Sequence, residues 1–168
     1  MEGNVINHGT LQGGDPPGTL NIIGNLTLRT NGTLSELLGG IGAGQFSQLD
    51  IGGSAALGGE LSVKLVDNFT LTGGDSFDIM NYASVSDGFS SFIFDGIACS
   101  SAGPDRWTCP NGHGLVFGEV IDPTSLFLNV TTSTTPLPTT LPLLASGLGV
   151  LGVLGWRRKR KGAALAAA

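Results

Sequence analysis

Charged side chains are scarce in this sequence, since Asp, Glu, Lys and Arg make up only 12% of its 168 residues. Basic residues are rarer still outside the C-terminus, because five of the eight are consecutive at 157–161. The residues before this run carry three basic and thirteen acidic side chains, a formal charge of −10. Such a surface repels phosphate backbones, so nucleic acid is excluded as an expected partner.

Strong helix formers other than Leu and Ala are also few, whereas glycine alone accounts for 28 residues. Ser, Thr and Asn are plentiful. This composition favours strands and turns over helices. A P-loop, a dinucleotide fingerprint and Gly-Gly-x-Gly-x-Asp repeats are all lacking, so no cofactor and no metal are expected.

Residues 1–10 lack the basic and apolar regions that make up a signal peptide. We expect residues 1–17 to be an N-terminal segment that is truncated, with Met1 an internal methionine or a misplaced start. The alternative is a gene fragment that is never exported.

The residues from 136 onward form three consecutive blocks. The first is a turn motif of Pro136, Leu137 and Pro138, and the second is an uncharged run that begins at Leu141 and ends at Trp156. The third is a cationic cluster of Arg157, Arg158, Lys159, Arg160 and Lys161. The uncharged run would rise about 24 Å as a helix, against a hydrocarbon core of about 30 Å. We predict a short transmembrane helix at 141–156, a cytoplasmic basic tail at 157–168, and residues 1–135 outside the cell membrane.

This three-part pattern resembles the C-terminal sorting signals of the PEP-CTERM class of exported bacterial proteins. The segment from Thr135 to Pro138 most resembles the subclass with a Val-Pro-Leu-Pro-Ala motif. The resemblance implies an exosortase-type membrane enzyme as partner, which would process the tail while it is held in the inner membrane. The body would then reach the cell surface or the extracellular matrix. The alternative is an ordinary tail anchor that is never processed.

Cys99 and Cys109 are the only cysteines. An even count in a chain expected outside the cytoplasm predicts a disulfide, which would close a short loop at 100–108. A metal site with Asp105 and His113 is the rival interpretation, but a Cys-x9-Cys spacing is not one that zinc sites use.

Short segments with alternating apolar residues follow one another between glycine turns. They predict strands at 18–23, 25–30, 32–37, 46–51, 59–66, 76–82, 89–94, 114–121 and 125–131. Gly-Thr-Leu or Gly-Glu-Leu recurs at residues 18, 32 and 59, a loose repeat that suits a solenoid with rungs of varying length. Segments 48–61, 73–79 and 87–89 also resemble the C-terminal strand-turn pattern of autotransporter passenger β-helices.

We therefore predict an all-β body at 18–131, a right-handed parallel β-helix with an antiparallel β-sandwich as the alternative. Residues 132–140 would form a Thr/Pro linker that contains the sorting motif.

Two candidate catalytic patterns are weak. Asp75 and Ser76 resemble the nucleophile block of GDS-type esterases, but no aspartate stands three residues before His113. The aspartates are spread over turns, where they are expected without catalysis. We predict a non-enzymatic structural or adhesive surface protein, with extracellular polysaccharide as a further partner. The alternative is a surface carbohydrate-active enzyme, a polysaccharide hydrolase or lyase, which would need an assembled acidic cleft.

Overall fold

The computed structural model describes residues 1–14 and 17–133. These residues form sixteen strands and no helix, which confirms the all-β prediction for this part of the chain. The strands are β1 (Val5–Asn7), β2 (Thr10–Gln12), β3 (Thr19–Ile22), β4 (Leu26–Leu28), β5 (Thr33–Leu38), β6 (Gln48–Ile51), β7 (Ser54–Ala56), β8 (Glu60–Leu65), β9 (Ser76–Asn81), β10 (Ser84–Ser86), β11 (Ser91–Phe94), β12 (Ile97–Ala98), β13 (Ser100–Gly103), β14 (Arg106–Thr108), β15 (Leu115–Ile121) and β16 (Ser125–Thr132).

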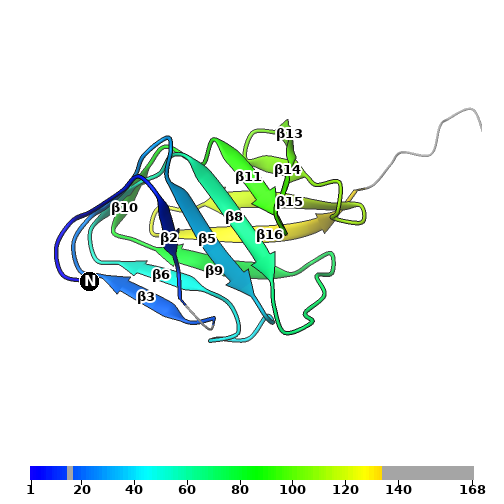
Figure 1. The fold of residues 1–168 in the computed structure, drawn as a ribbon, viewed down its shortest axis with the longest axis horizontal. Coiled ribbons are helices and arrows are strands. Elements are labelled where there is room, and N and C mark those ends of the chain that lie inside the picture. Colours follow the sequence, from blue (N-terminus) through cyan, green and yellow to red (C-terminus); the bar gives the residue numbers. More distant parts are fainter. Residues whose placement is uncertain (15–16, 134–168) are drawn as a thin grey trace, which may run out of the picture. The chain divides into compact units, whose positions relative to one another are not determined.

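The first eleven strands pair in parallel, with each strand from β1 to β8 bonded to the strand three places further along the chain. Strands β1, β4, β7 and β10 make one sheet, β2, β5, β8 and β11 belong to a second, and β3, β6 and β9 belong to a third. Figure 1 shows β2, β5, β8 and β11 running side by side. We call each set of three consecutive strands, one in each sheet, a three-strand repeat. This pairing rules out an antiparallel sandwich for β1–β11.

The repeats differ in length. In the second sheet Thr10 pairs with Thr33, Thr33 with Glu60, and Glu60 with Ser91, so successive repeats are 23, 27 and 31 residues apart. The recurring glycines at 32 and 59 therefore mark equivalent positions. The one at residue 18 does not, because Thr19 lies in the third sheet.

The core consists of inward side chains that stack from one repeat to the next. Leu11, Leu34, Leu61 and Phe92 occupy one such column, and all four are buried. Strict alternation along β5, β6 and β11 places every second residue inside. Burying each of these side chains contributes roughly 1.5–3 kcal/mol, so the columns hold the repeats together.

The parallel arrangement ends at β11. Strand β16 pairs antiparallel with β9, and β15, β14 and β13 follow as antiparallel neighbours. The expectation of a parallel solenoid continuing to residue 131 is therefore wrong for β12–β16. Only three residues connect β15 to β16 and two connect β13 to β14, and a parallel crossover needs a dozen or more.

The sheets also begin earlier than residue 18. Strand β1 pairs with β4 and β2 pairs with β5, so the first fourteen residues supply two strands of the first repeat. The compact unit of the described chain is Met1–Ser133.

Candidate functional site

The residues of the expected sorting signal, Pro136, Leu137 and Pro138, lie outside the described part of the chain. The same holds for the uncharged run 141–156 and the cationic cluster 157–161. Within residues 1–14 and 17–133, no helix is long and apolar enough to cross a membrane.

A groove of about 540 Å³ lies where the strands of the third sheet end. We call it the corner groove. Three residues from each of three repeats line it: Asn21, Ile22 and Ile23; Asp50, Ile51 and Gly52; and Asn81, Tyr82 and Ala83. The groove therefore runs across the stacked strands β3, β6 and β9.

The polar side of the corner groove is a ladder of Asn21, Asp50 and Asn81. Asn21 pairs with Asp50 and Asp50 with Asn81, so neighbouring members stand about 4.8 Å apart. The Asn81 Nδ2 donates a hydrogen bond of 3.0 Å to the Asp50 Oδ1. Two carboxamides and one carboxylate offer both donors and acceptors with little net charge, the polar chemistry that suits hydroxyl groups.

Small residues shape the other side of the groove. Gly52 and Ala83 take the positions that Ile23 has in the first repeat. A Cβ atom at Gly52 would meet the Ile23 carbonyl oxygen at 2.6 Å, so the chain can pass this closely only at glycine. The groove is therefore open above Gly52 and Ala83 and bounded by the exposed side chain of Ile23.

Asp78 lies near the ladder because of a β-bulge in β9. Met80 pairs with Leu126 and Asp78 with Phe127, which leaves Ile79 as the extra residue. Both Ile79 and Met80 are fully buried, so Asp78 and Asn81 emerge on the same side. Burial raises the pKa of Asp78, the Asn81 side chain lowers it, and the negative charge of Asp50 adds to the rise.

Tyr82 fixes the far end of the groove to the antiparallel strands. Its hydroxyl lies 2.9 Å from the carbonyl oxygen of Asp122 and 2.7 Å from that of Ser125, and donates its proton to this pair. Burial, followed by the charges of Asp122 and Asp78, raises the pKa of Tyr82. The tyrosine therefore ties the third repeat to the turn between β15 and β16.

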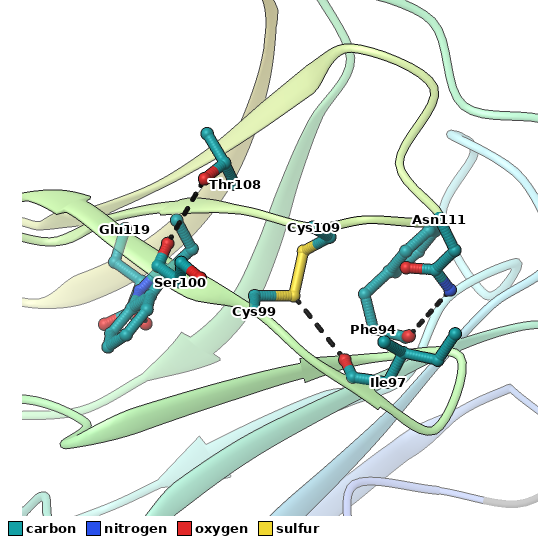
Figure 2. Close-up of a disulfide and its surroundings, with 9 residues drawn as sticks. Phe94, Ile97, Cys99, Ser100, Thr108, Cys109, Asn111 and Glu119 are labelled. Atoms are coloured by element: carbon teal, nitrogen blue, oxygen red, sulfur yellow. Dashed lines mark hydrogen bonds between the residues drawn. A yellow bond between two sulfur atoms is a disulfide. The ribbon is translucent and has the colours of Figure 1, made fainter.

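The predicted disulfide between Cys99 and Cys109 is present, with a Cα–Cα distance of 4.3 Å (Figure 2). The segment between them is not the expected loop. Strands β13 and β14 form a hairpin in which Ser100 pairs with Thr108, so the two cysteines stand opposite each other at its open end. Asn111, just beyond, donates a hydrogen bond of 2.9 Å to the Phe94 carbonyl oxygen and fastens this end to β11. The sequence does not predict this hairpin, because β13 consists of Ser, Ala and Gly and has no alternating apolar residues.

Two carboxyl groups are buried in positions that the sequence interpretation overlooked. Glu36, on β5, is fully buried, and neither of its carboxyl oxygens has a hydrogen-bond partner. Glu119, on β15, is 6% exposed and accepts a hydrogen bond of 3.0 Å from the Trp107 indole. Burial raises the pKa of Glu36 well above its usual range and is the main reason that the pKa of Glu119 is raised to about 7.

The candidate esterase residues have structural contacts. Asp75 accepts hydrogen bonds from the Thr72 backbone N–H at 2.8 Å and from the Thr72 hydroxyl at 3.0 Å, which closes a turn. The Ser76 hydroxyl donates to the Asn129 Oδ1 at 2.6 Å. These contacts account for both residues without a nucleophile.

Metal ligands do not gather in the described residues, where no three His, Cys, Asp or Glu side chains lie close enough to hold an ion. Cys99 and Cys109, the proposed soft ligands of the rival interpretation, are bonded to each other. A metal site built from their thiolates is therefore wrong.

Comparison with known proteins identifies a family motif in the C-terminal residues. No curated protein matches the chain, and no solved structure matches it. The similarity of segments 48–61, 73–79 and 87–89 to autotransporter passengers therefore stays a prediction.

The family model described as the PEP-CTERM protein-sorting motif matches residues 134–160. This span includes the Pro-Leu-Pro motif, the uncharged run and the first four cations. The chain thus carries, after its β body, the PEP-CTERM protein-sorting motif.

Proposed function

We propose that this protein is a non-enzymatic structural or adhesive component of the cell envelope or extracellular matrix. The PEP-CTERM motif implies export and membrane-anchored sorting toward the cell surface, and exosortase, a membrane enzyme, generally recognises it. On this proposal residues 141–156 span the inner membrane transiently with the basic tail 157–168 inside. Exosortase then removes the tail. The cationic cluster supports this orientation, because cations are retained on the cytoplasmic side.

The proposed body is a short right-handed parallel β-helix that the antiparallel strands close at one end. Parallel pairing of each strand from β1 to β8 with the strand three places on supports this proposal. Parallel crossovers within one sheet are right-handed in about 98% of cases, which supports a right-handed β-helix. A stack of this kind presents equivalent residues at regular intervals along one side, as the ladder of the corner groove does.

The proposed ligand of the corner groove is extracellular polysaccharide. The observation that carries this proposal is the ladder of Asn21, Asp50 and Asn81, which offers hydroxyl groups a row of donors and acceptors. A surface with a net negative charge favours a neutral over an acidic polysaccharide.

Binding is tested with the full chain in a nonionic detergent, immobilised and exposed to dextran, a neutral polysaccharide, and to alginate, an acidic one. We expect binding of dextran that Asp50→Ala and Asn81→Ala each weaken at least tenfold, about 1.4 kcal/mol. Asn129→Ala is the control, because Asn129 lies on β16 outside the groove. Unchanged binding in both groove variants, or preference for alginate, would contradict the proposal.

The carbohydrate-active alternative has one observation in its favour, since Asp50 and Asp78 lie close enough for the charge of Asp50 to raise the pKa of Asp78. The corner groove itself is lined by only one carboxylate. Release of new reducing ends from the bound polysaccharide by the wild-type chain, lost in Asp78→Asn, would replace the adhesive proposal with the enzymatic one.

A further inference from the structure

A second pocket lies among three segments that are far apart in the sequence. Its volume is about 410 Å³, which is within the range of about 300–1,000 Å³ that small-molecule sites occupy. The turn after β8, the end of β11 and the segment between β14 and β15 form it, within residues 65–71, 94–95 and 111–115. We call it the loop pocket. It shares no lining residue with the corner groove.

The apolar part of the loop pocket is held in place by the core. It consists of Leu65, Phe69, Leu71, Phe94 and Leu115. The ring of Phe69 meets Phe77 edge-on, with centroids 6.2 Å apart. The ring of Phe94 lies 4.8 Å from that of Phe117. Because Phe77 and Phe117 are fully buried, these contacts fix both rings of the pocket and offer a preformed apolar surface.

Short contacts also fix the segment between β14 and β15. Its first residue, Cys109, is bonded to Cys99 through the disulfide. The Gly112 N–H donates a hydrogen bond of 3.0 Å to the Cys109 carbonyl oxygen, and the Leu115 N–H donates one of 2.8 Å to the Gly112 carbonyl oxygen. A ligand of the loop pocket therefore has little backbone to order when it binds.

Asn111 supplies an acceptor that lacks a donor. Its Nδ2 donates a hydrogen bond of 2.9 Å to the Phe94 carbonyl oxygen, which sets the orientation of the carboxamide (Figure 2). The Asn111 Oδ1 is buried and has no hydrogen-bond partner in the described part of the chain. A buried acceptor without a donor is costly, so a ligand that brings an N–H or O–H group to this oxygen gains affinity.

Asp95 gives the loop pocket its charge. Among the described residues that line the pocket there is one carboxylate and no Lys or Arg. The Asp95 Oδ1 accepts a hydrogen bond of 2.9 Å from the Leu65 backbone N–H, which leaves Oδ2 for a ligand. The acidic character of the residues before the cationic cluster acts in the same direction. The pocket therefore favours a cation over an anion.

We propose that the loop pocket binds a small organic amine, with an aromatic or branched aliphatic body and a protonated amino group. The body of the amine lies against Phe69 and Phe94. The ammonium group has three donors and no acceptor, so it matches the two free acceptors, Asp95 Oδ2 and Asn111 Oδ1. This binding is independent of the proposed polysaccharide at the corner groove.

The experiment is an NMR titration of the amides of the full chain in a nonionic detergent. The probe is phenethylamine at pH 7, and phenylacetate, which carries a carboxylate near the same ring, is the matched anion. We expect saturable shifts at the amides of Asp95, Gly112 and Leu115, with a dissociation constant of about 1 mM or lower for phenethylamine. Phenylacetate should bind at least tenfold more weakly.

Two variants locate the site. Asp95→Asn keeps an oxygen for the Leu65 N–H and removes the charge, so the dissociation constant for phenethylamine should rise at least tenfold. The matched control is Asp87→Asn, because Asp87 is also exposed, also has a left-handed backbone and lies outside the loop pocket. Thr70→Trp places an indole at an exposed lining position and should block the pocket.

Several outcomes would overturn the proposal. One is a wild-type chain that shows no saturable shift with phenethylamine, or shifts that grow linearly over all strands, as partition of the probe into detergent would give. Another is equal affinity for phenylacetate. A dissociation constant that Asp95→Asn and Thr70→Trp leave unchanged, or that Asp87→Asn raises as much as Asp95→Asn does, would place the amine outside the loop pocket.

Discussion

The Trp107 indole donates its hydrogen bond to the Glu119 carboxyl group at 3.0 Å, and the other carboxyl oxygen has no partner. The same indole stacks on Phe92, with ring centroids 6.2 Å apart. Trp107 lies on the disulfide-bonded hairpin and Phe92 on the last parallel strand. The stack of Trp107 on Phe92 therefore joins the antiparallel strands to the three-strand repeats, and the carboxyl group that accepts from the indole has a pKa raised to about 7.

Stability should fall as the pH rises through the range in which Glu119 ionises. Its pKa is about 7 in the folded chain and 4.5 as the ordinary value, so the folded state holds a proton that the unfolded state has lost between these values. The contribution is complete below pH 4.5 and disappears as the pH passes 7. Each unit of pKa shift corresponds to about 1.4 kcal/mol, so the free energy of unfolding should fall by about 3 kcal/mol.

Glu119→Gln should remove this dependence while it keeps an acceptor for the indole. Urea unfolding at pH 4 and pH 8, followed by tryptophan fluorescence, measures the change. Glu60→Gln on the outward side of β8 controls for the loss of one negative charge. An unchanged pH slope in Glu119→Gln would show that folding does not raise the pKa of Glu119.

Glu36 should destabilise the body at neutral pH. It occupies an inward position between Leu34 and Leu38 and leaves both carboxyl oxygens without partners. An unsatisfied buried polar group costs roughly 1–3 kcal/mol, so Glu36→Leu should raise the free energy of unfolding by a similar amount at pH 7. Because the pKa of Glu36 is raised, the gain should grow as the pH rises. A loss of stability in Glu36→Leu at pH 8 would instead indicate that the carboxyl group makes a favourable contact.

Removal of the disulfide should weaken the hairpin and leave the parallel repeats folded. Closing a loop of about ten residues contributes roughly 2–3 kcal/mol through the unfolded state. Cys99→Ser with Cys109→Ser should therefore increase hydrogen exchange in β13 and β14 while the amides of β5 and β8 remain protected. Equal exchange of all these strands would show that the bridge supports the whole body.

The sequence predicted the long strands well because their alternation is regular. Nine expected segments coincide with β3, β4, β5, β6, β8, β9, β11, β15 and β16. Strands such as β7, with the sequence Ser54-Ala55-Ala56, were missed, since small residues give no apolar alternation and only pairing with β4 and β10 defines them. Glu36 was missed although period two from Leu34 points it inward, because a charged residue is assumed to face water.

The corner groove could not be found in the sequence for a different reason. Asn21, Asp50 and Asn81 are 29 and 31 residues apart, and their alignment depends on repeat lengths that vary. The bulge at Ile79 that brings Asp78 to the same side has no sequence signal either. The sorting motif, by contrast, was predictable because it is a contiguous pattern that the family model also matches.

The cationic cluster should set the retention of the tail at the membrane. Replacing residues 157–161 by neutral residues removes the positive charge that opposes translocation, so more of the chain should be lost to the external medium without processing. Fractionation of cells that express the variant and the wild type measures this. Identical distributions would show that the uncharged run alone is sufficient for retention.

The most direct test of the central claim, that the tail is a processed sorting signal, is mass spectrometry of the mature protein recovered from the cell surface. We expect no peptides from residues 162–168, and we expect the variant Pro136→Ala with Pro138→Ala to keep them and to remain in the inner membrane. Peptides from residues 162–168 still attached to the wild-type surface protein would contradict processing and leave an ordinary tail anchor in its place.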